Sequence, residues 1–222
     1  MSSNLTAPTI FYFQLLIGDF DLKTHPDNQE NLIVQLHSIV EPLDLAELFQ
    51  KPQPLEVELG CGDASFLVEH ARRNPEKNFI GVERLLGRIK KLDRKGRSAG
   101  LANLRGVRIE SSYFLQYLLP PRSAVALHIY FPDPWPKKKH RKHRLIGEIF
   151  PTLARAALAS GGVVYLRTDD ADYFSQMIEV FAASGEFQKV ETPVKLAELS
   201  TDFEREFRAH GVQTLRAAYQ LA

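Results

Sequence analysis

The stretch Leu55-Glu56-Val57-Glu58-Leu59-Gly60-Cys61-Gly62-Asp63 joins a short, mostly apolar segment to a glycine turn. Its composition and length predict a strand over 55–59. After the turn, Phe66, Leu67, His70 and Ala71 recur at the spacing of one helix face. The segment therefore predicts a strand, a glycine turn and a helix in immediate succession.

The same alternation of strand and helix continues along the chain. Further strands are predicted over 78–83, 103–109, 124–131 and 163–167, and helices over 84–98, 145–156 and 173–181. Gly161 and Gly162 are interpreted as the end of the helix that starts at 145. The run 124–131 is apolar almost throughout, which is typical of a strand buried on both faces. Strands that alternate with helices at this spacing predict an α/β fold, a mostly parallel sheet with helices on both faces.

Five acidic residues lie at or just beyond the ends of successive predicted strands. Ligands of such sheets bind outside the carboxyl ends of the strands, at the point where the strand order reverses. A solvated acid or a helix cap is the alternative for any one of them. Together they predict a ligand site lined by Glu58, Glu83, Glu110, Asp133 and Asp169.

The glycine turn and the acid that follows it favour a nucleotide-like cofactor. Gly60 and Gly62 let a ligand approach the backbone, and Glu83, about twenty residues later, can accept both hydroxyls of a ribose. A dinucleotide site would need a third glycine where this chain has Ser65, and nearby acids would repel a pyrophosphate. An adenosine cofactor with a positive charge and no phosphate fits better, and S-adenosylmethionine is such a cofactor.

If methyl transfer is the reaction, the residues also bear on the acceptor. Methylation at C5 of a pyrimidine needs a cysteine nucleophile, and the single cysteine, Cys61, lies inside the cofactor turn. A ring nitrogen with a free lone pair, such as guanine N7, needs no deprotonation. A fixed carboxylate near it, Asp133, would favour the positive charge that passes to the purine.

The segment Tyr130–Arg144 combines a proline-rich acidic loop with a block of positive charge. Pro132, Pro134 and Pro136 predict a stiff, non-helical loop, and six Lys or Arg residues follow within the eight positions 137–144, here called the basic segment. A solvated charged turn is the plain alternative. The other interpretation is an RNA-binding surface beside the acid, formed by Lys138, Lys139, His140, Arg141, Lys142, His143 and Arg144.

Other features of this region are less specific. Trp135 could stack on a base or only anchor the loop. His140 and His143 lack carboxylate or cysteine neighbours at metal-binding spacing, so no metal site is predicted. Net charge is +1, so an RNA partner is argued from clusters, and residues 84–97 contain a second group of Lys and Arg.

Length and composition predict a single globular domain. The chain has 222 residues, of which 44% are hydrophobic. Its single cysteine excludes an intramolecular disulfide and fits a reducing cytosol. The apolar stretch 10–17 is too short to span a bilayer and is interpreted as a strand or packing segment, and 31–49 as one or two helices. We expect a methyltransferase domain over 52–222 and assign no role to 1–51; monomer and homodimer remain alternatives.

Several motifs, in this order and at these separations, resemble the bacterial tRNA (guanine-N7-)-methyltransferase family over about residues 52–220. The proline-rich motif with its lysines is the most specific of them. The matching motifs are Glu58-Leu59-Gly60-Cys61-Gly62, Gly81-Val82-Glu83, Asn103-Leu104-Arg105, Phe131-Pro132-Asp133-Pro134-Trp135-Pro136-Lys137-Lys138, Thr168-Asp169 and Thr201-Asp202-Phe203-Glu204.

The resemblance implies a Rossmann-like class I methyltransferase with a seven-stranded, mostly parallel sheet. Residues 211–219 would form an antiparallel strand at or near its edge. The implied substrate is a guanosine in the tRNA variable loop. Contacts with S-adenosylmethionine are implied for Glu58, Gly60, Gly62, Glu83, Glu110 and Asp133.

The resemblance also implies roles towards the substrate. Asp133 would be the catalytic acid, with Glu83 on the cofactor ribose and Glu110 near the adenine. Contacts with the substrate guanosine are implied for Lys137, Asp169, Thr201 and Glu204.

Some residues depart from the family pattern or have a second interpretation. Ala64 stands where the family often has glycine, and Glu110 where it usually has aspartate. The motif Thr201-Asp202-Phe203-Glu204 is also a helix capping box. A small-molecule or amine methyltransferase and a non-catalytic RNA-binding module remain the alternative functions.

Overall fold

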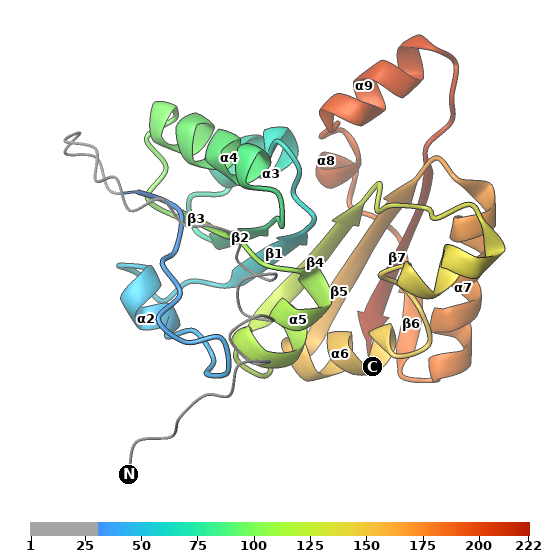
Figure 1. Cartoon of the computed structure of the whole chain (residues 1–222), viewed down its shortest axis with the longest axis horizontal. Coiled ribbons are helices and arrows are strands. Elements are labelled where there is room, and N and C mark those ends of the chain that lie inside the picture. Colours follow the sequence, from blue (N-terminus) through green and yellow to red (C-terminus); the bar gives the residue numbers. More distant parts are fainter. Residues whose placement is uncertain (1–30) are drawn as a thin grey trace.

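The computed structural model describes residues 31–222, apart from the side chains at positions 203 and 208. Seven strands form one sheet in the order β3-β2-β1-β4-β5-β7-β6 (Figure 1). The segment 10–17, interpreted as a strand or packing segment, lies outside the described residues. The strands are β1 Leu55–Leu59, β2 Asn78–Val82, β3 Leu104–Val107, β4 Ala124–Tyr130, β5 Leu158–Thr168, β6 Phe187–Val190 and β7 Leu215–Leu221.

The first five strands are parallel, as predicted for a doubly wound sheet. β1 pairs with β2 on one side and with β4 on the other, so the strand order reverses at β1 and β4. β7 runs antiparallel to both β5 and β6. This confirms the α/β fold and the antiparallel last strand. The edge itself is β6, which the sequence analysis did not predict.

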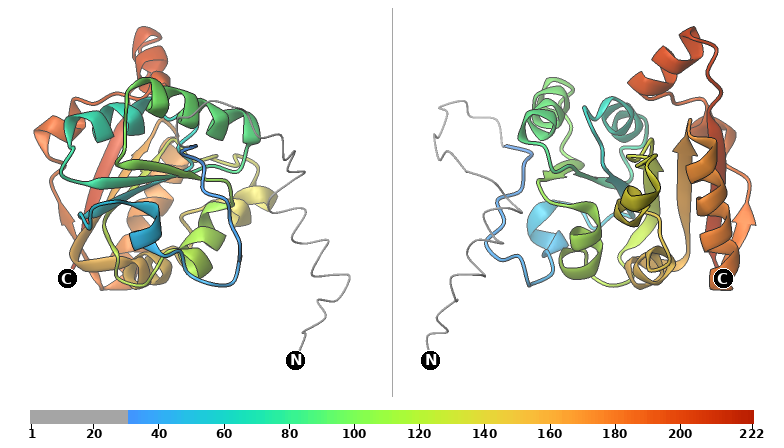
Figure 2. Two further views of the ribbon diagram at one scale, coloured as in Figure 1. Left: turned by 90° about the vertical axis from the view of Figure 1, so that its left-hand side faces the viewer. Right: turned by 45° about the vertical axis from the view of Figure 1, so that its right-hand side comes forward.

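Helices cover both faces of the sheet. One face packs against α3 (Ser65–Arg73) and α4 (Leu86–Ser98). The other packs against α5 (Ser111–Tyr113), the π-helix η1 (Phe114–Leu118), α6 (Phe150–Ala157) and α7 (Ala171–Ser184), as Figure 2 shows. Two short helices, α8 (Val194–Ala197) and α9 (Asp202–Ala209), stand beyond the carboxyl ends of β4 and β5 (Figure 1).

Strands β1 and β2 are buried along their whole length and β4 along nearly all of it, and this burial fixes their register. Val57, Ile80 and Leu127 have no solvent exposure. Burying a side chain of this size stabilises a fold by about 1.5–3 kcal/mol. The strands carry these residues on one face, under α5–α7, so a shift by one position would turn them away from their core.

The described part of the N-terminal region differs from the prediction of one or two helices. Residues 31–44 are irregular, and only α2 (Leu45–Leu48) is helical. The backbone of 32–34 instead pairs with Gly106 at the free edge of β3, with two hydrogen bonds of 2.8 Å. Pairing with an open strand edge satisfies these groups, and Pro42 cannot donate the hydrogen bond that a continuous helix needs.

The segment 145–168 also differs from the prediction. α6 starts only at Phe150, and β5 begins at Leu158 and runs through Gly161 and Gly162. Gly161 has φ +71°, which glycine adopts without strain. The two glycines therefore mark a bulge within a strand, where the strand register shifts, and not the end of a helix.

Across residues 31–222, no helix has both the length and the apolar character that crossing a lipid bilayer requires.

Candidate active site

The five predicted acids gather at one edge of the sheet because β1 to β5 are parallel. Glu58 is the penultimate residue of β1, Glu83 directly follows β2, and Asp169 directly follows β5. Glu110 and Asp133 each lie three residues beyond the ends of β3 and β4. This edge includes the point between β1 and β4 where the strand order reverses, which is where ligands of such sheets bind.

The glycine turn after β1 leaves open space above its backbone. Gly60 and Gly62 have φ values of +75° and +55°, and no atom lies within 4 Å of a Cβ added to either. A side chain there would be strained and would occupy this space. Ala64 also adopts a left-handed conformation, with φ +59°, at the position where the family often has glycine.

Glu83 fixes the turn to the neighbouring strand. Its Oε2 accepts a hydrogen bond of 3.1 Å from the Gly62 N–H, and its Oε1 accepts one of 2.8 Å from the Leu85 N–H. The side chain is buried, so the carboxylate is held rigidly beside the turn. Glu110 has a comparable local role, since it accepts the N–H groups of Ser112 and Tyr113 at the start of α5.

Glu58 is the least satisfied acid of the site. It is 3% exposed, and its Oε2 has no hydrogen-bond partner among the described residues. Burial raises the pKa of this carboxyl well above its usual range, although the nearby Arg167 opposes the shift. A buried carboxylate oxygen without a partner is costly, and a positively charged ligand would satisfy it.

The loop after β4 is non-helical up to Lys137, as the prolines predict. Phe131 and Trp135 adopt left-handed φ values of +51° and +44°. Such values are strained for bulky side chains and often mark functional loops. Asp133 lies between them and is exposed at the carboxyl edge.

Trp135 contacts the basic segment. Its ring lies 5.2 Å from that of His143 and 6.0 Å from that of His140, and 37% of its surface is exposed. These rings come from the same loop, so the indole helps to shape the loop while one part of it faces solvent.

The basic segment forms a 3-10 helix, η2 (Lys138–His143), and most of its cations are exposed. Arg144 differs from the prediction of an RNA contact because it is 5% exposed. It donates hydrogen bonds of 2.7 Å to Pro134 O, to Gln176 Oε1 and to Asp172 Oδ2. Its guanidinium therefore ties the proline-rich loop to α7. Arg141 also pairs with Asp172, at 2.9 Å.

The motif at 201–204 has the geometry of a capping box. The Glu204 N–H donates to Thr201 Oγ1 at 3.0 Å, and the Thr201 N–H donates to Glu204 Oε2 at 3.1 Å. Glu204 also pairs with Arg167 and Arg216. Both motif residues are buried, whereas Asp169 and Lys137 are exposed at the carboxyl edge.

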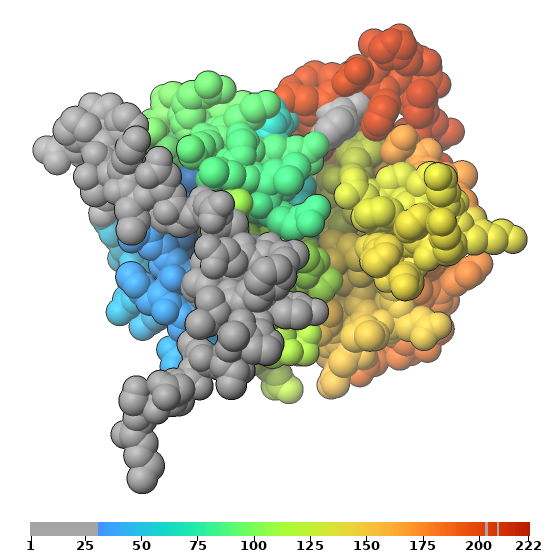
Figure 3. Space-filling model, in the orientation of Figure 1, coloured from blue at the N-terminus to red at the C-terminus, as the bar shows by residue number. Residues whose placement is uncertain are grey.

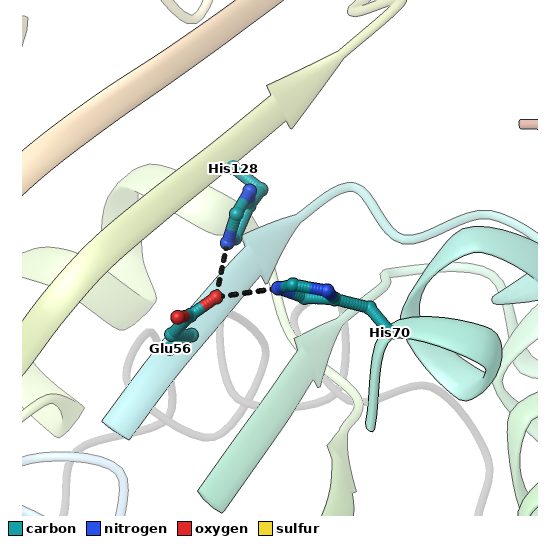
Figure 4. A group of neighbouring side chains, drawn as sticks. All are labelled: Glu56, His70 and His128. Atoms are coloured by element: carbon teal, nitrogen blue, oxygen red, sulfur yellow. Dashed lines mark hydrogen bonds and ion pairs between the residues drawn. The ribbon is translucent and has the colours of Figure 1, made fainter. Parts of the chain in front are cut away.

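A buried polar cluster beneath the site was not predicted. Figure 4 shows Glu56 between His70 and His128, and Glu56 Oε2 lies 2.8 Å from Nε2 of each imidazole. Lys77 Nζ lies 2.7 Å from the other carboxylate oxygen. The sequence shows only a histidine inside the buried run 124–131, and it does not show that this histidine contacts Glu56, because the strand register pairs it with Glu58.

The protons of this cluster can be assigned from its contacts. The pKa of Glu56 is far below its usual range, because hydrogen bonds from His128 and His70 outweigh the opposing effect of burial. Burial lowers the pKa of His128, which keeps that ring neutral. A carboxylate only accepts, so both rings carry their proton on Nε2. Glu56, His70 and His128 each offer one possible metal-ligand atom, and these three atoms lie within 4.8 Å of one another, close enough to bind one metal ion.

The strand order, the reversed last strand and the acid-lined carboxyl edge define a class I methyltransferase fold. Solved structures of this fold are similar to the chain. The 16S rRNA methyltransferase KamB matches with a TM-score of 0.56 at 17% identity, covering 82% of this chain and 95% of that one. The antibiotic-resistance methyltransferase Kmr matches with a TM-score of 0.55 at 15% identity, covering 80% and 91%.

Sequence comparison identifies the family. A family model described as a putative methyltransferase matches residues 52–217. A tRNA (guanine-N(7)-)-methyltransferase of Halorhodospira halophila is 34% identical over 184 residues, which are 81% of this chain and 80% of the relative. The chain belongs to the tRNA (guanine-N(7)-)-methyltransferase family.

Other relatives with the same name are longer than the matched region. The enzyme of Aeromonas hydrophila is 38% identical over 65% of this chain, and that of Thermotoga maritima 34% over 78%. The matched regions cover 61% and 56% of those two relatives, so this chain spans about three fifths of their length.

Proposed function

We propose that the chain transfers a methyl group from S-adenosylmethionine to guanine N7 in tRNA. The names of its relatives support the reaction. The observation that carries the proposal is the arrangement of three features at one edge of the sheet. They are the Glu58 oxygen that has no hydrogen-bond partner among the described residues, the exposed Asp133 and the basic segment. These features provide a place for a cationic cofactor, a carboxylate beside the acceptor, and a phosphate-binding surface.

The residues around the glycine turn fit the proposed cofactor. S-adenosylmethionine supplies an electrophilic methyl group on a positively charged sulfur. Gly60 and Gly62 leave space for it, and a cationic ligand would provide the partner that the buried Oε2 of Glu58 lacks within residues 31–222. By family resemblance, Glu83 holds the ribose and Glu110 lies near the adenine. Both carboxylates are oriented by backbone N–H groups.

Asp133 is the proposed catalytic acid on the substrate side. Guanine N7 has a free lone pair, so the acceptor needs no base, and positive charge develops on the purine. A carboxylate on a proline-restricted loop stabilises that charge without reorganising. Burial raises the pKa of the Cys61 thiol well above its usual range, which supports excluding this cysteine as a nucleophile.

The remaining proposed contacts are with the RNA. Lys137 and Asp169, both exposed at the carboxyl edge, are proposed to hold the guanosine. The exposed cations of the basic segment hold the RNA backbone. Arg144 supports this surface indirectly, through Pro134 O. We propose that Thr201 and Glu204 close over the base by holding the start of α9, because Glu204 already accepts from two arginines. Because tRNA is the proposed substrate, we also propose a cytoplasmic location for the protein.

Labelled methyl transfer followed by nucleoside analysis tests this function. Purified protein, unmodified tRNA transcript and radioactive S-adenosylmethionine should yield 7-methylguanosine. A matched transcript made with 7-deazaguanosine has carbon at position 7 and should accept no label. Label in N2-methylated, N6-methylated or ribose-methylated nucleosides would contradict the proposal. Failure to bind S-adenosylmethionine by calorimetry would instead favour a non-catalytic RNA-binding module.

A further inference from the structure

Helix α4 exposes a row of cations that the proposed site does not use. Its buried side carries Ile89 and Leu92, which have no solvent exposure and pack on the sheet. The opposite side, together with a residue two positions before the helix, exposes a set of basic side chains. They are Arg84, Arg88, Lys90, Lys91 and Arg94.

Little negative charge offsets these cations. Asp93, the one acid within α4, accepts hydrogen bonds from Leu32 N–H and from Arg97. Glu83 lies 3.8 Å from Arg88 but already accepts two backbone N–H groups. Within residues 31–222, Arg84, Lys90, Lys91 and Arg94 form no ion pair. Since the whole chain has a net charge of +1, this surplus is local.

Helix α4 and the basic segment both reach the surface on one face of the molecule. Figure 3 shows α4 in green and the residues around η2 in yellow on one face. α4 begins three residues after Glu83 and covers β2 and β3, whereas η2 follows β4 and is tied to α7. The two basic groups therefore flank the carboxyl edge from opposite halves of the sheet.

The extent of the row fits a nucleic-acid backbone. From Arg88 to Arg94 the helix advances by about 9 Å, at 1.5 Å per residue. That length exceeds two phosphate spacings of about 3.4 Å along one strand of a duplex. A phosphate backbone needs only exposed cations for attachment, without apolar contacts. A membrane would need the apolar side of α4, which is buried.

We propose that α4 is a second RNA-binding surface, which holds phosphates of the tRNA away from the target guanosine. The proposal rests on the proposed function, because it extends the substrate contacts of that site. The basic segment then binds the backbone near the target base, and α4 holds a separate part of the same tRNA. This division would let the enzyme distinguish a folded tRNA from a short RNA that carries the same guanosine.

The test is a triple variant, Lys90→Gln, Lys91→Gln and Arg94→Gln, assayed by tRNA binding over a range of salt concentrations. We expect weaker binding and a slope of log affinity against log salt that is smaller by about 2–3, near one per lost phosphate contact. The kcat at saturating tRNA should not change, because none of the three residues belongs to the catalytic machinery. Circular dichroism verifies that the variant folds.

A matched control removes three exposed cations at other parts of the surface. It carries Arg122→Gln, Arg155→Gln and Lys189→Gln, from the amino-terminal side of β4, from α6 and from β6. The control should keep the wild-type salt slope. A slope equal to that of wild type in the α4 variant, or an equal loss in both triple variants, would overturn the proposal.

A short hairpin that carries the target guanosine provides the second readout. Its binding should be unaffected by the α4 variant, whereas binding of whole tRNA is weakened. Equal weakening of both RNAs would refute a separate surface. These binding measurements do not require turnover. A wild-type protein that fails to methylate guanine N7 would therefore refute the proposed function, whereas the salt slopes and the hairpin comparison test the α4 surface separately.

Discussion

Arg167 Nη1 lies 2.6 Å from Glu204 Oε2 and so joins the end of β5 to the start of α9. Both side chains are almost fully buried. Arg167 also donates to the carbonyls of Leu196 and Leu199, at 2.7 and 2.6 Å. One arginine thus holds α8, α9 and the turn between them against the carboxyl edge, beside Glu58.

Removing the charge of Glu204 should release this segment. Glu204→Gln leaves Arg167 buried and Arg216 partly buried without a carboxylate partner, and breaking a buried pair in this way costs about 3–5 kcal/mol. We expect a lower urea midpoint and cleavage by protease within 193–210. An unchanged urea midpoint would contradict the role of this pair.

The variant Thr201→Ala removes the helix cap but leaves the Glu204–Arg167 ion pair in place, so it distinguishes the effects of the two contacts. It removes one side-chain acceptor of the capping box and should cost only about 1 kcal/mol. If Thr201 acts only as a cap, the KM for tRNA stays at the wild-type value once the variant is folded. A raised KM with normal stability would assign Thr201 a direct contact with substrate.

Arg144 is predicted to support stability and turnover rather than to bind RNA. Arg144→Met removes hydrogen bonds to Pro134 O, Gln176 and Asp172, and we expect a loss of about 2–3 kcal/mol, together with lower kcat. The exposed Lys142→Met serves as the matched control and should change stability by less than about 0.5 kcal/mol. Urea denaturation and steady-state kinetics measure both effects, and equal stability of the two variants would refute the assignment.

The sheet and its acidic edge could be predicted because their signals are local. Apolar runs such as 124–131 indicate buried strands, and the glycine turn after Leu59 indicates where the first strand ends. Parallel order then brings the acids that follow these strands to one edge. The same local reasoning failed at Gly161, where a pair of glycines serves a bulge and not a helix end.

The buried polar contacts could not be predicted, because each depends on partners far along the chain. Arg144 looked like its neighbours in the basic segment, but α7 supplies two of its three hydrogen-bond partners, 32 and 28 positions away along the chain. Arg167 meets Glu204 across 37 positions, and His128 meets Glu56 across 72. Spacing within one segment contains no information about such pairs.

Glu58→Gln should stabilise the cofactor-free protein while weakening cofactor binding. The folded-state pKa of Glu58 is raised, so between about pH 4.3 and that value the folded state holds a proton that the unfolded state has lost. Stability of the wild type therefore falls as pH rises through this range. At a pH above this range, Glu58→Gln should be more stable than the wild type by about 1–3 kcal/mol. Denaturation against pH and calorimetry with S-adenosylmethionine test the two effects, and weaker stability at pH 8 would contradict the expectation.

Asp133→Asn should lower kcat by a factor of about 10²–10³ with tRNA still bound. The carboxylate is exposed, so its loss should leave the fold intact. Its proposed work is to stabilise positive charge on the purine, and a neutral amide of the same shape does this poorly. A single stabilising group of this kind contributes about 10²–10³ in kcat. Retained turnover, or loss of tRNA binding equal to the loss of kcat, would reject Asp133 as the catalytic acid.

His128 should make the stability of the protein depend on pH below neutrality. Burial lowers the folded-state pKa of His128, so below about pH 6.5 the unfolded state takes up a proton that the folded state does not. Stability therefore falls as pH falls through this window, by up to about 1.4 kcal/mol per pH unit. Glu56 acts in a lower window, because its unfolded carboxyl is protonated near pH 4.3 while the folded one remains ionised.

The variant His128→Gln isolates the histidine contribution. Glutamine can still donate to Glu56 but does not titrate, so the stability of the variant should depend less steeply on pH between 5.5 and 7. The exposed His143→Gln is the control and should retain the wild-type slope. Urea denaturation at four pH values measures each slope. Of the two variants, only His128→Gln removes a buried imidazole, which lies in β4 just before the Asp133 loop. If this variant keeps the wild-type dependence of stability on pH, the titrating group lies elsewhere in the fold.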